Sequence, residues 1–185
     1  MKKKKGSIIV ELLAALPVLF LVAWSAMQII FYSNAMSTMH GATMEGARTL
    51  SSELRGYEGP MPTSGVQHDE LKTKLLNKMA NTTQFSNLIL LFHDEEKPLS
   101  PEVIFEDQGK CDTAMNNNNN HRVICAYTVM STVPGTGVDQ EQIVVKAKAR
   151  FWVIGNFIPG LKETMFADGM GVSQKELSGR YQYYK

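Results

Sequence analysis

The residues best suited to a specific chemistry stand near the N-terminus, where one acid lies inside an apolar stretch. Gly6 ends a basic run, Ser7 opens the apolar stretch, and Glu11 is the only charged residue from 7 to 33. An ionised carboxylate at the centre of a membrane helix costs about 2.5–3.5 kcal/mol, and less near the helix end. Either a cation compensates Glu11, or Glu11 lies at the interface and its carboxylate reaches water.

Cleavage of the chain after Gly6 would supply such a cation. Ser7 would then carry a new α-amino group, and Ser7 and Glu11 are four residues apart, on one face of a helix. The amine could pair with Glu11 of its own chain or of a neighbouring chain. The residues alone leave this interpretation and the interfacial one open.

The two cysteines are a second chemical feature. Cys111 and Cys125 are the only cysteines, and both lie far from the apolar stretch. An oxidising compartment favours their pairing. In the chain-entropy model a disulfide that closes about 15 residues contributes roughly 3 kcal/mol. Two cysteines without histidine at ligand spacing are a poor zinc pattern, so we predict a disulfide, with no metal and no cofactor.

No set of residues predicts catalysis. The four histidines are scattered along the chain, at His40, His68, His93 and His121. His68 is followed by two acids, but it lies in a lysine-rich amphipathic pattern, so we expect it on a solvated helix face. There is no phosphate-binding loop and no G-x-S-x-G or H-E-x-x-H motif. We therefore predict no catalytic residues and no enzyme, and the net charge of +1 gives no reason to expect nucleic acid as a partner.

The apolar stretch itself predicts a membrane anchor. Residues 7–33 form 27 helical residues, roughly 40 Å at about 1.5 Å each, against a hydrocarbon core of about 30 Å. Lys2–Lys5 flank it on the N-terminal side, so the positive-inside rule keeps the N-terminus in the cytoplasm and exports the rest. A cleaved secretory signal peptide is the alternative, but its apolar core should be only about 7–15 residues long.

The helix is expected to continue beyond the membrane. One helical face from residue 34 to 56 is apolar or small, with Met36, Met39, Thr43, Ala47, Leu50 and Leu54 at spacings of three and four. Glu45 and Arg48 can pair on the outer side. Gly41 and Gly46 either weaken the helix or allow close approach of another backbone. A run rich in glycine and proline ends this helix, which we expect to be about 45 residues long.

The remaining residues predict a small α+β domain. The expected elements are a helix at 66–80, a buried strand at 85–92, loop from 93 to 110, an antiparallel pair of strands at 122–133 and 143–155 joined by a turn at 134–137, and one more strand within 162–185. Asn116–Asn120 should be a solvated loop between the cysteines. The fold class is α+β, a long N-terminal helix with a transmembrane half and a soluble half, packed on a small, mainly antiparallel sheet. The predicted division is a basic leader (1–6), a transmembrane helix (7–33), a helix extension (34–56) and an extracytoplasmic domain (57–185).

The N-terminal residues resemble a known family. Gly6 followed by Ser7-Ile8-Ile9-Val10-Glu11 resembles the leader junction of type IV pilins and pseudopilins, in which a prepilin peptidase cuts after the glycine and glutamate is the fifth mature residue. The stretch 11–19, with a proline soon after the glutamate, and the E-G-A-R segment within 42–48 resemble TadE-like pseudopilins. The likeness covers about residues 2–50. Ser7 stands where major pilins usually have phenylalanine, and Leu12 where an aromatic residue often follows the glutamate.

This resemblance implies a function. The protein would be a minor pilin-like component of a Tad (Flp-type) pilus assembly system, acting in pilus biogenesis and adhesion. It would span the bacterial inner membrane once, with the C-terminal domain in the periplasm or the pilus. Its partners would be the prepilin peptidase, other pilin-like subunits, the assembly platform and membrane lipid. The alternative is an unprocessed, signal-anchored module for ligand binding or adhesion, and cleavage after Gly6 separates the two.

Overall fold

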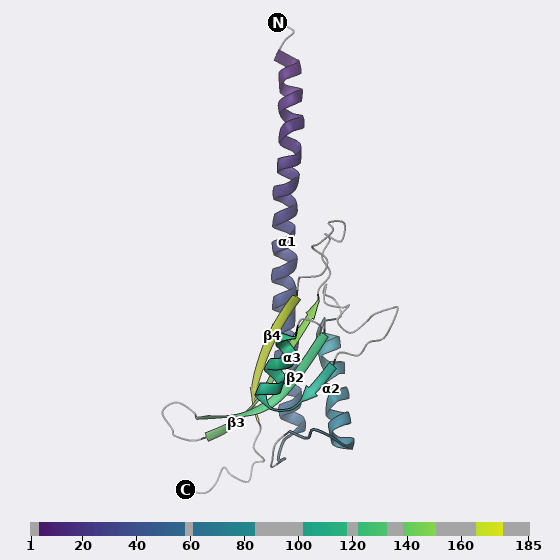
Figure 1. Ribbon diagram of the computed structural model, residues 1–185, viewed down its shortest axis with the longest axis vertical. Coiled ribbons are helices and arrows are strands. Elements are labelled where there is room, and N and C mark those ends of the chain that lie inside the picture. Colours follow the sequence, from purple (N-terminus) through teal and green to yellow (C-terminus); the bar gives the residue numbers. More distant parts are fainter. Residues whose placement is uncertain are drawn as a thin grey trace.

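The computed structural model begins with one long helix, α1 (Lys4–Glu53), whose first half projects from the rest of the protein and whose second half packs on it (Figure 1). Its 50 residues extend about 75 Å at 1.5 Å per residue. Pro17 lies inside it, and the helix continues on both sides of that residue. The predicted continuous helix is therefore confirmed, somewhat longer than expected.

The structure describes six segments of the chain. These are residues 4–57, 61–83, 102–117, 122–132, 139–150 and 166–175.

The described residues after α1 form a small α+β head. In chain order its elements are α2 (Val66–Thr83), β1 (Glu102–Phe105), α3 (Gln108–Asn116), β2 (Arg122–Thr132), β3 (Asp139–Arg150) and β4 (Phe166–Gln174). The strands form one sheet in the order β1-β2-β3-β4, with β1 parallel to β2 and the other two pairings antiparallel. The predicted α+β class and the predicted antiparallel pairing of the two central strands are confirmed.

The sheet is covered on both faces, and the alternation of β3 shows why. Val145, Ala147 and Ala149 are fully buried in the core that the sheet forms with α1 and α2. Lys146 and Lys148 alternate with them and lie on the opposite face, beside α3. This is the period of two that the sequence predicts for a half-buried strand.

The prediction of loop from 93 to 110 is wrong for its described part. Residues 102–105 form β1 beside β2, and α3 begins at Gln108 after its N-cap, Asp107, whose side chain accepts a hydrogen bond from Lys110 N at 2.9 Å. Four residues are too few for a reliable periodic pattern, and the pairing of β1 is a contact between distant parts of the chain. The predicted strand at 85–92, the turn at 134–137 and residues 151–155 lie outside the described residues.

Candidate functional site

The residues of the predicted leader junction lie on α1. The helix begins at Lys4, so Gly6, Ser7 and Glu11 follow one another in its first turns, with Ser7 and Glu11 one turn apart on the same face. The Glu11 side chain is exposed. Cleavage after Gly6 and the role of Glu11 in assembly stay predictions.

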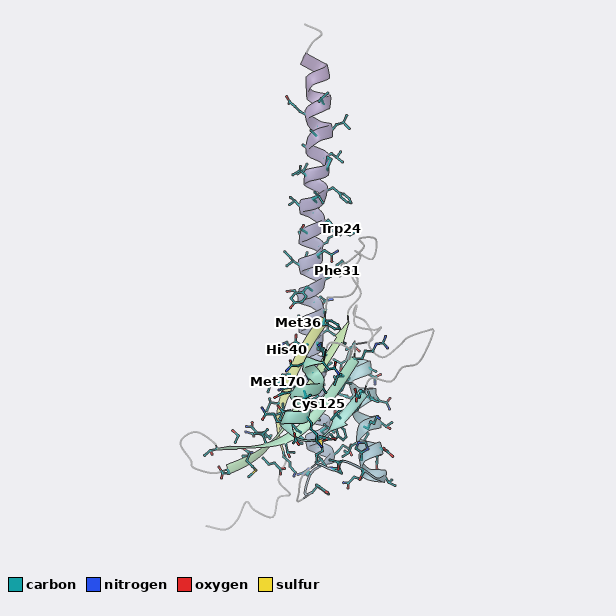
Figure 2. All side chains as sticks on the ribbon, viewed as in Figure 1. Trp24, Phe31, Met36, His40, Cys125 and Met170 are labelled. Carbon is teal, nitrogen blue, oxygen red and sulfur yellow. A yellow bond between two sulfur atoms is a disulfide. The ribbon has the colours of Figure 1, made fainter. Side chains whose placement is uncertain are left out.

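The N-terminal half of α1 exposes a continuous apolar surface, drawn as sticks along the upper helix in Figure 2. The most apolar window of this helix has a mean hydropathy of 2.1, and none of that window is buried. The large apolar side chains that are exposed there are Val10, Leu12, Leu13, Leu16, Val18, Leu19, Phe20, Leu21, Val22, Met27, Ile29 and Ile30. Among the described residues, α1 is the one helix long and apolar enough to cross a membrane. Such a surface fits a single-pass membrane anchor, because it would be costly in water.

The surroundings of α1 change at Ala35, its first fully buried side chain among those described. From there the helix packs on the head. About three turns before this point, Trp24 stacks on Phe20, with ring centroids 6.0 Å apart. Aromatic side chains of this kind are common at a membrane–water interface.

The helix lies very close to the sheet at two glycines of β4. A Cβ atom at Gly171 would lie 2.2 Å from the backbone carbon of Thr43, and one at Gly169 would lie 2.8 Å from that of Met39. Only glycine permits such an approach between a strand and a helix backbone. Ser51 reinforces the contact, since its hydroxyl donates to the carbonyl oxygen of Gln174 at the end of β4.

The opposite flank of the same helix packs on α2. Gly46 is buried, and a Cβ atom there would lie 2.8 Å from the Leu75 side chain, whereas a Cβ at Gly41 would meet nothing within 4 Å. Of the two alternatives for these glycines, close approach of another backbone therefore occurs at neither: Gly46 makes room for the side chains of α2, and Gly41 faces open space. Glu45 pairs with Arg48 at 3.0 Å, as predicted, and also with Lys78 of α2 at 3.5 Å.

A second ion-pair group joins the C-terminal end of α1 to the middle of α2. Lys74 Nζ lies 2.6 Å from a carboxylate oxygen of Glu53 and 2.9 Å from one of Glu70. The hydrogen bond to Glu53, followed by that to Glu70, raises the pKa of Lys74. These groups are exposed, so they align the two helices more than they stabilise them.

The other face of the sheet carries the disulfide. Cys111 of α3 and Cys125 of β2 form a disulfide and are fully buried, with Cα atoms 5.7 Å apart. Lys146 Nζ donates to Asp112 Oδ1 at 2.6 Å, and this hydrogen bond raises the pKa of Lys146. Lys148 Nζ donates to the carbonyl oxygen of Met115 at 2.9 Å. One covalent bond and two lysines therefore hold α3 against β2 and β3.

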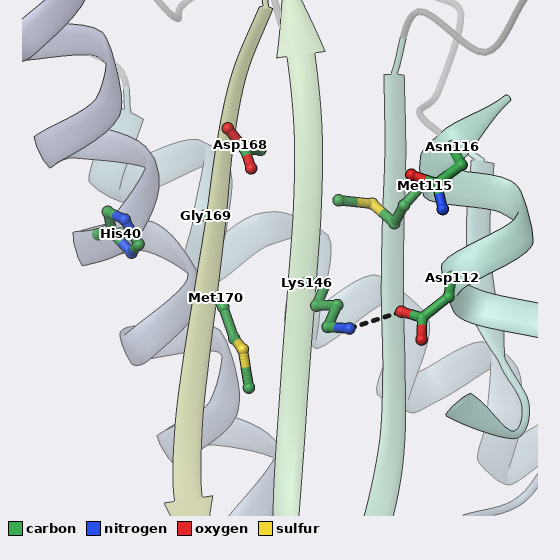
Figure 3. Close-up of a pocket in the computed structure, with 8 residues that line it drawn as sticks. All are labelled: His40, Asp112, Met115, Asn116, Lys146, Asp168, Gly169 and Met170. Carbon is green, nitrogen blue, oxygen red and sulfur yellow. Dashed lines mark hydrogen bonds and ion pairs between the residues drawn. The ribbon is translucent and has the colours of Figure 1, made fainter. Parts of the chain in front are cut away.

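Beside α3 lies an open hollow of about 280 Å³, which the close-up in Figure 3 shows. It is lined by His40, Asp112, Met115, Asn116, Lys146, Asp168, Gly169 and Met170. Its lysine is held protonated by the bond to Asp112, so it is a poor base. In the described part of the chain, no three His, Cys, Asp or Glu side chains come together as metal ligands.

The prediction of a solvated His68 is wrong. Its ring packs edge-on against Phe105, with centroids 5.3 Å apart, and only 17% of its side chain is exposed. Its Nδ1 lies 3.0 Å from the exposed carboxylate of Asp69. The error follows from the missed strand β1, which brings Phe105 beside α2. His93 and His121 lie outside the described residues.

The two glycines of β4 are functional positions that no sequence-based prediction included. The signal was present in F-A-D-G-M-G-V-S-Q, where glycine recurs at a spacing of two. In a strand this spacing places both glycines on one face, and such positions indicate close approach of another backbone.

The fold and this surface define a class of protein, an α+β head carried on one long helix whose exposed half fits a membrane anchor. The family comparison narrows the class. The model of the family described as TadE-like protein matches residues 6–48. The match confirms the resemblance predicted from the leader junction and the E-G-A-R segment. No curated protein and no solved structure matches the chain.

The match suggests a component associated with the Tad pilus. The matched segment contains the apolar half of α1 and its first turns on the head, through Arg48.

Proposed function

We propose that this protein is a minor pilin-like subunit of a Tad pilus assembly system, acting in pilus biogenesis and adhesion. The match of residues 6–48 to the TadE-like family carries the proposal, and the exposed apolar half of α1 supports it. In this proposal residues 7–33 span the bacterial inner membrane, the basic residues 1–6 stay in the cytoplasm, and the head lies outside it. The role is structural, without catalysis.

The proposal includes processing by a prepilin peptidase. The peptidase would cut after Gly6 and leave Ser7 as the first mature residue, which removes Lys2–Lys5 together with the leader. In the mature chain the Ser7 amine would be the cation nearest to Glu11 in sequence. The helical backbone supports this pairing because Ser7 and Glu11 share one face of α1.

Glu11 would then act in assembly. In a lone subunit the amine and the carboxylate lie near water, where their attraction is only about 1 kcal/mol at 4 Å. When membrane helices pack together, Glu11 of one subunit meets the Ser7 amine of another away from water. There the attraction is larger, so ion pairing would select correctly staggered neighbours.

Intact mass and N-terminal sequencing of the protein from its native cell test the processing. We expect a chain that starts at Ser7, and the full chain in a strain without the peptidase. Gly6→Ala should block the cut, while the control Gly41→Ala, at an exposed glycine further along α1, should leave it unchanged. A wild-type chain that keeps Lys2–Lys5 beside an active peptidase would instead favour the unprocessed, signal-anchored module.

A further inference from the structure

The strand β4 forms one edge of the described sheet and leaves backbone groups unpaired. Lys175 N, just after β4, donates to the carbonyl oxygen of Glu141 at 2.9 Å. Hydrogen-bonded and non-hydrogen-bonded pairs alternate along an antiparallel ladder. Lys175 therefore belongs to a hydrogen-bonded pair, and so does every second residue before it in β4. The residues between them, which include Asp168, Met170 and Val172, have N–H and C=O groups that point away from β3.

A side chain of α1 closes the C-terminal end of this edge. Ser51 of α1 donates to the outward carbonyl of Gln174. In the segments that the structure describes, no group bonds to the outward N–H and C=O groups of residues 168, 170 and 172.

The side chains around the edge also lack the usual protection. Exposed edge strands normally carry lysine or proline, which discourage the addition of another strand. β4 has neither, and Asp168 is its only charge. Met170 is 46% exposed and Val172 is 36% exposed on one side of the strand. Met44 of α1, which is 39% exposed, adds an apolar side chain next to the edge. It follows Thr43, which faces β4, and is turned about 100° round the helix toward the side of Ser51, the residue that bonds to the edge.

Asp168 is the one charged residue of β4, and it lies without an ion pair among the described residues. Lys148 lies opposite Asp168 in the ladder but donates instead to the Met115 carbonyl oxygen. Figure 3 shows Asp168 and Met170 along one strand, at the hollow that faces α3. The exposed side of β4 is therefore acidic at its start and apolar beyond it.

The direction of β4 restricts what can pair with it. Gly169 faces Met39 and Gly171 faces Thr43. Two strand residues advance about 6.7 Å and four helix residues about 6 Å, so β4 and α1 run side by side in the same direction. Figure 1 shows β4 lying along the lower half of α1.

A second copy of this chain fits the edge poorly. Antiparallel pairing of two β4 strands about a two-fold axis would point the two α1 helices in opposite directions, which one membrane with one insertion direction does not allow. Parallel pairing about a two-fold axis along the strands would set each outward N–H against the same N–H of the other copy. Neither symmetric arrangement satisfies the edge.

We infer that the β4 edge binds an extended segment of a different pilin-like subunit, which adds a fifth strand to the sheet. The segment carries apolar residues at alternate positions, to cover Met170 and Val172, and a lysine or arginine in the same alternation, to meet Asp168. Main-chain hydrogen bonds to residues 168–172 supply the register. The identity of the partner rests on the proposed pilus function; the strand addition rests on the edge itself.

Site-specific photo-cross-linking of the full-length protein in its native membrane tests this inference. A photo-reactive residue in place of Met170 should cross-link to an extended segment of another pilin-like protein, mapped by mass spectrometry of the joined peptides. The same residue in place of Val66, which is 87% exposed on α2, is the matched control and should give at least tenfold less.

Edge variants sharpen the test. Val172→Lys and Asp168→Lys should each lower the cross-link from position 170 at least tenfold, whereas Val66→Lys should leave it unchanged. Unfolding midpoints equal to the wild type would show that the fold is kept. Three results would each overturn the inference: cross-links to a second copy, cross-links to residues 176–185 of the same chain, or a yield no higher than the background from position 66. The N-terminal mass reports separately on the proposed function, so the two can fail independently.

Discussion

Replacing Gly171 by alanine tests whether the contact between β4 and α1 holds the head on its helix. The new Cβ would lie 2.2 Å from both the carbon and the oxygen of Thr43 and 2.4 Å from Met44 N. Carbon atoms in contact normally sit at about 3.5 Å, so the strand or the helix would have to move by more than 1 Å. All three atoms belong to the backbone of a helix, so no side chain can rotate away to make room.

The expected cost is large for one methyl group. Overpacking a well-packed core costs about 1–3 kcal/mol and sometimes more, and a clash with helix backbone belongs at the upper end. We expect Gly171→Ala to lower the free energy of unfolding by about 3 kcal/mol. Gly41→Ala is the matched control, because a Cβ there meets nothing within 4 Å. It should raise the stability by up to about 1 kcal/mol through helix propensity.

Urea unfolding of the full-length protein in detergent micelles, followed by near-ultraviolet circular dichroism, measures both variants. The two should differ by about 4 kcal/mol, with opposite signs relative to the wild type. A Gly171→Ala protein whose free energy of unfolding is within about 0.5 kcal/mol of the wild type would refute the reasoning. A change that small is typical of a harmless surface substitution and not of a buried clash.

Three further outcomes are expected. Replacing Cys111 and Cys125 by serine should lower the stability of the head by about 3 kcal/mol, and non-reducing peptide mapping of wild-type protein alkylated in the envelope should recover the joined peptides rather than free thiols. Lys146→Met should destabilise by about 1 kcal/mol through loss of the partly exposed bond to Asp112. That bond raises the folded-state pKa of Lys146, so its contribution to stability is complete below the ordinary pKa of 10.5 and disappears as the pH rises through the folded-state pKa. The stabilities of the wild type and Lys146→Met should therefore converge only in alkaline solution. Glu11→Ala should still be inserted and cleaved, but it should no longer co-purify with other pilin-like subunits or support surface pili. Glu11→Gln separates the effect of charge from that of hydrogen bonding. Normal piliation by Glu11→Ala would mean that Glu11 is only an interfacial residue.

Sequence reasoning succeeded where a long periodic pattern exists. The buried face of α1, which includes Met39, Leu50 and Leu54, follows the spacing of three and four. The alternation of β3 identified its buried side without any partner strand. It failed for β1 and α3, which are short. It also failed for His68, whose environment depends on Phe105 from β1.

The sequence by itself determined the membrane-anchor candidate, the α+β class and the family likeness, because each depends on residues close together along the chain. A run of apolar residues is apolar whatever it packs against, and Gly6 and Glu11 keep their spacing on any helix. Only the tertiary structure decided that β4 lies along α1, since that contact joins residues about 130 positions apart and depends on glycines whose effect is steric. The unpaired edge at Asp168, Met170 and Val172 follows from the same packing. Hydrogen-bond register is a property of paired strands, and no single strand carries it.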